Sequence, residues 1–232
     1  LQFATNNNGF DGADGTKIVI DEPNIKMMFS KLKEWLDEGY FGYYGTGWGD
    51  NQSAFEKQEV AMWLGSSGSF GGLSKSADFE FSATFLPYWS SITEEPYQTF
   101  IGGAALFAMS GKSAEENKAT AAFFKFLSSP EIQLMWHKET GYVPITQAAY
   151  ELAKTQGYYD EKPAAEIGIL QLAGTEGEWT KGYRMGYYVQ IRDVMNREYG
   201  KILSGDESVD AAFATIQAES DKLLDRFAAT QK

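Results

Sequence analysis

Hydrophobic residues recur at helical spacing through most of this chain. Apolar positions three and four apart follow Pro23, continue to Leu36 and end at Gly39, which predicts a helix with proline in its first turn and a glycine stop. Ser113 and Glu116 are spaced as a capping box and predict another helix start. Further helices are expected around 53–58, from Pro130 to Gly141, and at 146–156, 163–172, 187–204 and 208–228.

Short apolar or β-branched runs predict strands at 16–20, 59–64, 79–87 and 100–109. The last run is interrupted by Gly102 and Gly103. Glycine inside a strand costs stability and often marks close approach of a ligand or another backbone, although a β-bulge is the alternative. A few strands among many helices indicate the α/β class.

Tyr142 stands directly after the predicted helix stop at Gly141 and before Val143 and Pro144. A tyrosine held just past a glycine stop by a rigid proline turn can point its hydroxyl into a cleft. The alternative is a tyrosine in the core. Tyr142 is therefore a candidate ligand contact.

Residues 65–69 read Gly-Ser-Ser-Gly-Ser. Glycine and serine expose backbone N–H groups and small hydroxyls, which can donate to a sugar hydroxyl or to phosphate oxygens. An ordinary flexible loop is the alternative. The run is not the nucleophile elbow of hydrolases, because serine stands where that motif needs its last glycine.

The overall composition restricts the function classes. The chain has 232 residues with 43% hydrophobic and 15% aromatic content, which indicates a folded globular protein. Its net charge of −12 disfavours nucleic acid as a partner. With no cysteine, disulfides, thiol catalysis and thiolate metal sites are excluded. An acidic protein that binds an anion needs a cation within its site.

Arg192 is the candidate for that cation. It lies near the start of a predicted helix, beside Val194 and Met195. An arginine among apolar neighbours either pairs with a carboxylate or holds an anionic ligand in a bidentate manner. Asp193 and Glu198 are the candidate partners for the first case, and the sequence leaves both cases open.

Catalysis and metal binding find little support. His137 is the only histidine, and its place in a helix beside Trp136 predicts a packing or surface role. No acidic cluster has the spacing of a calcium loop. We therefore expect no catalytic residue, no metal site and no cofactor.

The order and spacing of several motifs resemble the extracellular solute-binding proteins of ABC importers, in particular the glycerol-3-phosphate-binding branch. The resemblance covers nearly the whole chain. The motifs are Asn6-Asn7-Asn8-Gly9-Phe10-Asp11-Gly12, Ser66-Ser67-Gly68-Ser69, Ile101-Gly102-Gly103-Ala104, Trp136-His137, Thr140-Gly141-Tyr142-Val143-Pro144-Ile145-Thr146, Thr180-Lys181-Gly182 and Gln190-Ile191-Arg192.

The resemblance implies a periplasmic binding protein-like (class II) fold of two α/β lobes that close on a ligand. It carries the ligand contacts over to Ser66, Ser67, Gly103, Tyr142 and Arg192. It assigns 1–98 and 151–232 to the second lobe and 99–150 to the first lobe. The asparagine-rich motif stands midway along family members but opens this chain, so the lobes are expected to be incomplete, with the N-terminal part missing.

The function implied is capture of glycerol-3-phosphate or a related glycerophosphodiester and its delivery to an ABC permease in the membrane, without catalysis. The expected location is the periplasm, or the outer surface of a single-membrane bacterium through a lipid anchor. Partners would include the missing N-terminal lobe or a second chain. The alternatives are a neutral sugar or oligosaccharide binder of the same family, a hydrolase, and an interaction module without a small ligand.

Overall fold

The computed structural model describes residues 10–11, 17–47, 49–99, 101–174 and 185–230. The Asn6-Asn7-Asn8-Gly9 and Thr180-Lys181-Gly182 motifs, Gly12 and Thr16 lie outside this part. The chain divides into two units, each described by itself. The first comprises Leu1–Trp63, Pro87–Phe100 and Gly174–Lys232, and the second Leu64–Leu86 and Ile101–Ala173. The lobe boundaries expected at 98/99 and 150/151 stay predictions.

A short strand pair opens the described part of the first unit. Strands β1 (Phe10–Asp11) and β2 (Lys17–Ile18) are antiparallel, with Phe10 opposite Ile18. Gln217 fixes the chain beyond β2, because its amide donates to the Ile18 carbonyl at 2.9 Å and accepts from the Ile20 N–H at 3.4 Å. The predicted strand at 16–20 is thus confirmed over Lys17–Ile18.

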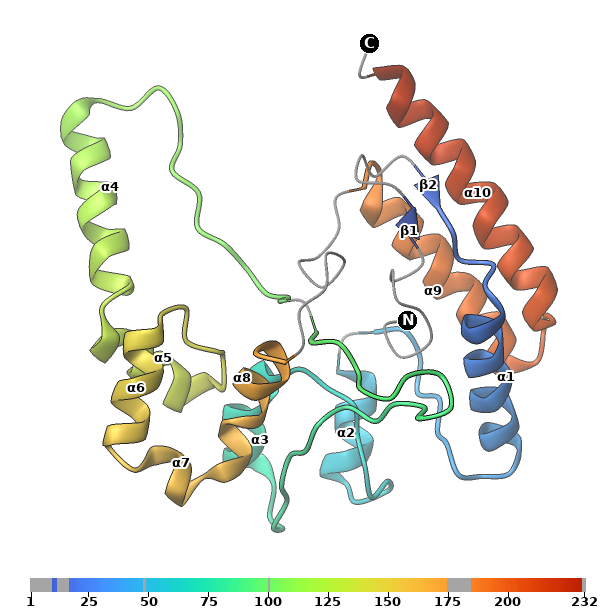
Figure 1. The fold of residues 1–232 in the computed structure, drawn as a ribbon, viewed down its shortest axis with the longest axis horizontal. Helices are drawn as coiled ribbons and strands as arrows, with labels where there is room; N and C mark the ends of the chain where they lie inside the picture. Colours follow the sequence, from blue (N-terminus) through green and yellow to red (C-terminus); the bar gives the residue numbers. More distant parts are fainter. Residues whose placement is uncertain (1–9, 12–16, 48, 100, 175–184, 231–232) are drawn as a thin grey trace. The chain divides into compact units, whose positions relative to one another are not determined.

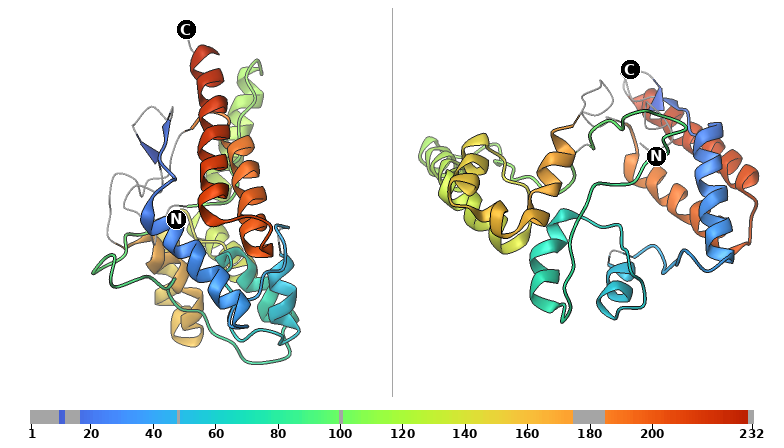
Figure 2. Two further views of the ribbon diagram at one scale, coloured as in Figure 1. Left: turned by 90° about the vertical axis from the view of Figure 1, so that its right-hand side faces the viewer. Right: turned by 60° about the horizontal axis from the view of Figure 1, so that its bottom comes forward.

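Helices α1 (Pro23–Asp37), α9 (Tyr188–Ser204) and α10 (Val209–Thr230) build the core of the first unit, and α2 (Asp50–Glu56) belongs to it as well. Helices α9 and α10 lie side by side in both sets of views (Figures 1 and 2). The Phe29 ring stacks on Tyr199 with centroids 4.1 Å apart. The core residues include Ile20, Ile25, Ile191, Ile202, Phe213, Ile216 and Leu224. Burying each such side chain contributes about 1.5–3 kcal/mol.

The second unit is a set of short helices. Its elements are η1 (Ser67–Ser69), α3 (Phe70–Ser76), α4 (Ala114–Leu127), α5 (Pro130–Thr140), α6 (Gln147–Thr155), α7 (Tyr158–Glu161), η2 (Pro163–Ala165) and α8 (Ile167–Leu172). The capping box of Ser113 and Glu116 is confirmed at the start of α4. Leu134, Ala153, Tyr158 and Tyr159 form the buried core.

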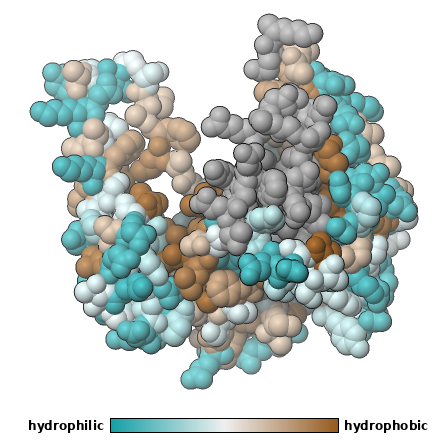
Figure 3. Space-filling view, viewed as in Figure 1, coloured by the Kyte–Doolittle hydropathy of each residue, from teal (hydrophilic) through white to brown (hydrophobic). Residues whose placement is uncertain are grey.

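Three strand predictions are wrong. Within the described residues, no β-ladder includes the runs at 59–64, 79–87 or 101–109, and Figure 1 draws the last as a long trace leading to α4. A strand needs a neighbour for its backbone hydrogen bonds, and apolar content does not provide one. Ile101, Leu106, Phe107 and Met109 are instead exposed, and apolar atoms follow this segment in Figure 3. Helices η1, α3 and α7 are not predicted by the sequence patterns.

None of the helices in the described residues is both long and apolar enough to cross a membrane.

Candidate ligand-binding site

The turn after α5 holds Tyr142 by both of its backbone polar groups. Gly141 adopts φ +85°, and its N–H donates to the His137 carbonyl at 2.8 Å. The Tyr142 N–H then donates to the Thr140 hydroxyl oxygen at 3.1 Å, and the Tyr142 carbonyl lies 2.7 Å from His137 Nδ1. The Thr140 hydroxyl donates in turn to the Trp136 carbonyl at 2.6 Å. Tyr142 is left 47% exposed.

The serine–glycine segment packs against this turn backbone to backbone. A Cβ added at Gly141 would collide with the Ser67 carbonyl oxygen and lie 3.0 Å from Phe70 Cβ. A Cβ added at Gly71 would lie 2.6 Å from the Glu139 carbonyl oxygen. Only glycine fits at these positions, and the close approach fixes the segment of Ser66 and Ser67 relative to Tyr142.

We expect Gly141→Ala to destabilise the second unit by more than the ~1–2 kcal/mol that a left-handed backbone costs an alanine, because the new Cβ also meets the Ser67 carbonyl. Gly157→Ala is the matched control, since Gly157 has φ +71° and its nearest neighbour is Asp160 Oδ2 at 3.7 Å. Urea denaturation measures both. Equal losses for the two variants would contradict the close packing.

Ser66 and Ser67 have different surroundings. Ser66 caps η1, with its Oγ accepting the Gly68 N–H at 3.2 Å, and its hydroxyl proton is not used in that bond. Ser67 lies against Gly168, where an added Cβ would be 3.2 Å from Ser67 Oγ. Both serines are exposed. The segment is therefore packed against the rest of the unit through Ser67 and Gly168.

Gly103 and Gly68 lie against opposite edges of the Tyr142 ring. An added Cβ would be 3.8 Å from Tyr142 Cε1 at Gly103 and 3.2 Å from Cε2 at Gly68. Gly103 has φ +126°, which side chains with a Cβ rarely adopt, whereas Gly102 has open space around it. The structure thus brings Ser66, Ser67, Gly103 and Tyr142 together, with glycine required at position 103 by its backbone.

Arg192 belongs to the first unit and lies in α9. The sequence predicts an arginine among apolar neighbours, but Arg192 is exposed. Ile191 and Val194 are buried in the core on the other face of the helix. Its guanidinium carbon lies 5.8 Å from the centre of the Tyr188 ring. Among the described residues no ion pair joins Arg192 to a carboxylate.

Glu198 is not the partner of Arg192. It is buried and accepts from Arg197 Nε at 2.5 Å and from Lys201 Nζ at 2.9 Å. Of the alternatives for Arg192, pairing with Glu198 is therefore wrong. An anion-binding role for Arg192 stays a prediction.

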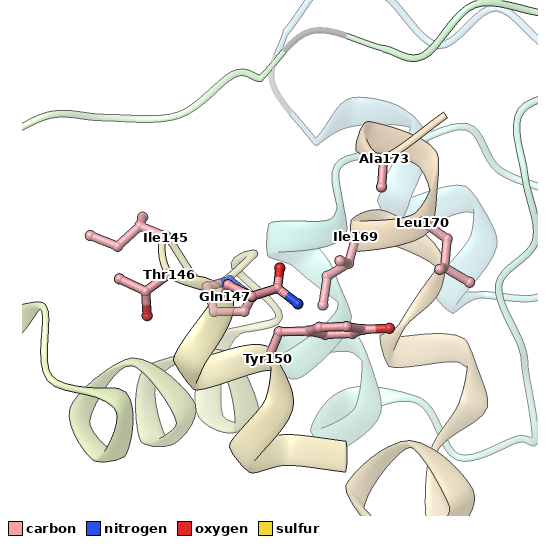
Figure 4. Close-up of a pocket in the computed structure, with 8 residues that line it drawn as sticks. Ile145, Thr146, Gln147, Tyr150, Ile169, Leu170 and Ala173 are labelled. Atoms are coloured by element: carbon pink, nitrogen blue, oxygen red, sulfur yellow. The ribbon is translucent and has the colours of Figure 1, made fainter. Parts of the chain in front are cut away.

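A cavity of about 190 Å³ lies beyond the Tyr142 turn and is lined from the segment of Pro144 to Gln147 and by Tyr150, Ile169, Leu170 and Ala173. Figure 4 shows the Tyr150 ring alongside Gln147 of α6 and Ile169 of α8. The Tyr150 hydroxyl donates to Glu166 at 2.6 Å, and this bond raises the Tyr150 pKa to about 12. None of the five predicted ligand contacts lines this cavity.

The family model for bacterial extracellular solute-binding proteins matches residues 2–166. The chain belongs to this family. Its sequence is 36% identical over 233 aligned positions to the sn-glycerol-3-phosphate-binding periplasmic protein UgpB of Salmonella typhimurium, covering 100% of this chain and 53% of that protein. UgpB of Escherichia coli O6:H1 is 34% identical with the same coverage. This member of the solute-binding family thus spans about half the length of these relatives.

Solved structures share its fold. UgpB from Mycobacterium tuberculosis, in complex with glycerophosphocholine, superposes with a TM-score of 0.77 at 21% identity, covering 96% of this chain and 54% of that one. The cyclic alpha-maltosyl-1,6-maltose binding protein from Arthrobacter globiformis gives 0.67 at 24% identity, covering 93% and 52%. These likenesses support a periplasmic binding protein-like fold. The described residues are mostly helical, with β1 and β2 as a two-stranded sheet, so the α/β pattern expected from the sequence is not borne out in them. The incompleteness of the lobes stays a prediction.

Sequence reasoning missed the residues that support Tyr142. His137 was expected to pack or to lie at the surface, and it is buried with both ring nitrogens hydrogen-bonded. One signal was available, because a histidine in the last turn of a helix can reach the free carbonyl groups beyond it. The contribution of Tyr159 had no local signal, since it comes from another helix.

Proposed function

We propose that the full-length protein is the substrate-binding component of an ABC importer. It captures glycerol-3-phosphate or a related glycerophosphodiester in a cleft between two lobes and delivers it to a membrane permease. Ligand binding shifts an equilibrium between open and closed forms, and no reaction is catalysed. The protein works in the periplasm, or at the outer surface of a single-membrane bacterium through a lipid anchor.

The main support for an anionic ligand is the exposure of Arg192 without an ion pair among the described residues. In a chain of net charge −12, this arginine is exposed on α9. Its planar guanidinium can donate two parallel hydrogen bonds to a phosphate group. The relatives with 34–36% identity are named for sn-glycerol-3-phosphate, which supports the same class of ligand.

Four of the predicted ligand contacts belong to the second unit. In this proposal the Tyr142 hydroxyl, the Ser66 and Ser67 hydroxyls and the Gly103 N–H donate hydrogen bonds to a ligand. The packing of Gly68 and Gly103 against the edges of the Tyr142 ring supports it, because pre-placed donors lose little conformational entropy on binding.

We infer that the lobes are completed by an N-terminal region of the full-length protein. The coverage of about half of each relative supports this inference. The apolar run with exposed Leu106, Phe107 and Met109 also supports it, because a neighbouring strand would satisfy its backbone and cover its side chains. With half of the cleft, this chain alone is expected to bind ligand weakly or not at all.

A neutral sugar is the second candidate ligand. Structures of similar fold include the maltotriose-bound maltodextrin-binding domain from Bdellovibrio bacteriovorus, with a TM-score of 0.66 at 19% identity, and the exposed Tyr142 offers a face on which a sugar ring can stack. A sugar ligand would make no use of the charge on Arg192.

A hydrolase finds less support, because both nitrogens of the single histidine are occupied by Tyr142 and Tyr159. Catalytic turnover of a phosphate ester or a glycoside would contradict the proposal that the protein only binds its ligand. An interaction module without a small ligand predicts that no ligand shifts the melting temperature.

Calorimetric titration of the full-length protein tests the proposal, with glycerol-3-phosphate, glycerophosphocholine and maltose as ligands. We expect saturable binding of at least one of the two phosphate compounds and none of maltose. The same titrations into this chain alone are expected to give little or no heat. Binding of maltose only would favour the sugar alternative, and silence from all three would reject the proposed ligand class.

A further inference from the structure

His137 and Tyr159 are joined to the candidate ligand contact Tyr142 by a continuous chain of hydrogen bonds. His137 lies in α5 and is 1% exposed. Its Nδ1 is 2.7 Å from the Tyr142 carbonyl oxygen, and its Nε2 is 3.2 Å from the Tyr159 hydroxyl. These hydrogen bonds therefore connect the buried core of the second unit to the backbone of Tyr142, which is exposed.

The two hydrogen bonds of His137 fix which ring nitrogen is the donor and which is the acceptor in a neutral imidazole. A carbonyl oxygen only accepts, so Nδ1 carries the imidazole proton and donates to Tyr142. Nε2 is then the acceptor of a hydrogen bond that the Tyr159 hydroxyl donates. Burial lowers the pKa of His137 and raises that of Tyr159, which agrees with a neutral ring and a protonated phenol.

The backbone that the histidine holds leads directly to the Tyr142 ring. The Thr140 hydroxyl fixes the Tyr142 N–H, and His137 fixes its carbonyl, so the peptide groups on both sides of the Cα are restrained. The ring then stands against Gly68 and Gly103. Removing the histidine would leave the Tyr142 carbonyl without this hydrogen bond.

We propose that His137 and Tyr159 are positioning residues for ligand binding, acting through the Tyr142 backbone to fix the direction of the Tyr142 ring and so to place its hydroxyl at the ligand. This rests on the proposed function, in which Tyr142 contacts the ligand. Neither residue touches the ligand itself.

A double-mutant cycle in the full-length protein tests the proposal, with glycerol-3-phosphate as the titrant. We expect His137→Leu to raise Kd about 10-fold and Tyr159→Phe about 3-fold, while His137→Asn, which keeps a donor near the Nδ1 position, stays within about 2-fold of wild type. Tyr158→Phe is the matched control. Tyr158 is the adjacent buried tyrosine of α7, with its ring 5.6 Å from that of His137, and no hydrogen bond joins it to the histidine in the described structure.

The decisive comparison is the same set of variants in a Tyr142→Phe background. If His137 and Tyr159 act through the Tyr142 hydroxyl, their effects on Kd shrink to within about 2-fold there, although any loss of thermal stability remains. Undiminished effects on Kd in that background would overturn the proposal. Should His137→Leu fail to fold, Tyr159→Phe carries the test.

Carbon-13 NMR signals of the tyrosine rings test the positioning of Tyr142 without a ligand. This measurement therefore distinguishes a failure of the positioning inference from a failure of the proposed function. A wild-type protein that binds no glycerol-3-phosphate rejects that ligand, and the Tyr142 ring signal, assigned with Tyr142→Phe, then decides the positioning role. We expect this signal to shift in Tyr159→Phe and to stay in place in Tyr158→Phe. An unmoved Tyr142 signal in Tyr159→Phe and His137→Leu overturns the positioning of the ring.

Discussion

Arg192→Ala is expected to raise the Kd of the full-length protein for glycerol-3-phosphate roughly 100-fold. Two charge-assisted hydrogen bonds to a phosphate are worth about 3 kcal/mol together, and each 1.4 kcal/mol corresponds to a factor of ten. Arg192 has no ion pair among the described residues, so its removal leaves no described carboxylate unpaired and the loss reports the ligand contact. Calorimetric titration at about 0.15 M ionic strength is the measurement.

Arg226→Ala is the matched control for this variant. Arg226 is exposed on α10, and its guanidinium carbon lies 5.7 Å from the Tyr187 ring, much as Arg192 lies 5.8 Å from Tyr188. Both changes remove one positive charge and one contact between an arginine and an aromatic ring. We expect Arg226→Ala to leave Kd within about 2-fold, since an exposed charge that does not contact the ligand is largely screened by salt. Equal effects of the two variants would reduce the role of Arg192 to net charge.

Arg192→Lys separates the contribution of the positive charge from that of the planar guanidinium geometry. A lysine keeps the charge but gives up the planar pair of donors, so an intermediate Kd is expected for a phosphate ligand. If Arg192→Ala binds maltose as wild type does, and neither protein binds glycerol-3-phosphate, the neutral-sugar alternative replaces the proposed function.

The helical part of the fold was predictable because its signals are local. The proline and glycine that bound α5, and the serine–glutamate box that starts α4, act over a few residues and are found where the sequence places them. The runs at 79–87 and 101–109 carry strand-like composition, but a strand depends on a partner elsewhere in the polypeptide. The local sequence of each run therefore cannot show whether a partner strand is present.

The candidate site divides in the same way. Gly141 and Tyr142 were found from a helix stop and a proline turn, and Gly103 from its position in an apolar run. The meeting of Gly68 and Gly103 on one ring depends on tertiary packing, as does the bond from Tyr159 to His137. The sequence offers Arg192 as a charged candidate, and its role stays a prediction, whereas its exposure on α9 follows only from the helix phase of Ile191 and Val194.

Glu198 is a buried carboxylate of the first unit that pairs with two cations. Its side chain is 0% exposed, and it accepts from Arg197 and Lys201, whose side chains are 47% and 41% exposed. Lys201 also pairs with Glu207 at 3.3 Å, and Arg197 with Glu219 at 2.9 Å. One buried carboxylate thus joins two cations that remain in contact with water.

The pKa of Glu198 reflects two opposing causes. Burial alone would raise it, but the hydrogen bonds from Lys201 and Arg197 more than offset that effect, so the pKa lies below its ordinary value of 4.5. A carboxyl group with a lowered pKa in the folded state contributes stability above its unfolded pKa. That contribution is lost as the pH falls from about 4.5 through the folded pKa.

We expect Glu198→Ala to lower the free energy of unfolding of the first unit by about 2–4 kcal/mol at pH 7. Breaking a buried ion pair costs about 3–5 kcal/mol, and hydration of the two half-exposed cations reduces that cost. Glu198→Gln keeps the shape and an acceptor oxygen, so a loss of about 1–2 kcal/mol is expected. Urea denaturation followed by tryptophan fluorescence measures both, since Trp35 and Trp89 stack in this unit with ring centroids 6.1 Å apart.

Glu219→Gln is the matched control, because Glu219 pairs with the same Arg197 but is 40% exposed. An exposed pair of this kind contributes about 0–1 kcal/mol, so its loss is expected to be small. As the pH falls from about 4.5 through the folded pKa of Glu198, wild type and Glu219→Gln are expected to lose the Glu198 contribution, whereas Glu198→Gln, which lacks this titrating group, shows a shallower decline. Parallel pH profiles for Glu198→Gln and wild type would show that the buried carboxylate does not carry the acid sensitivity of the unit. Parallel profiles together with equal stability at pH 7 would mean that solvent replaces its hydrogen bonds without cost.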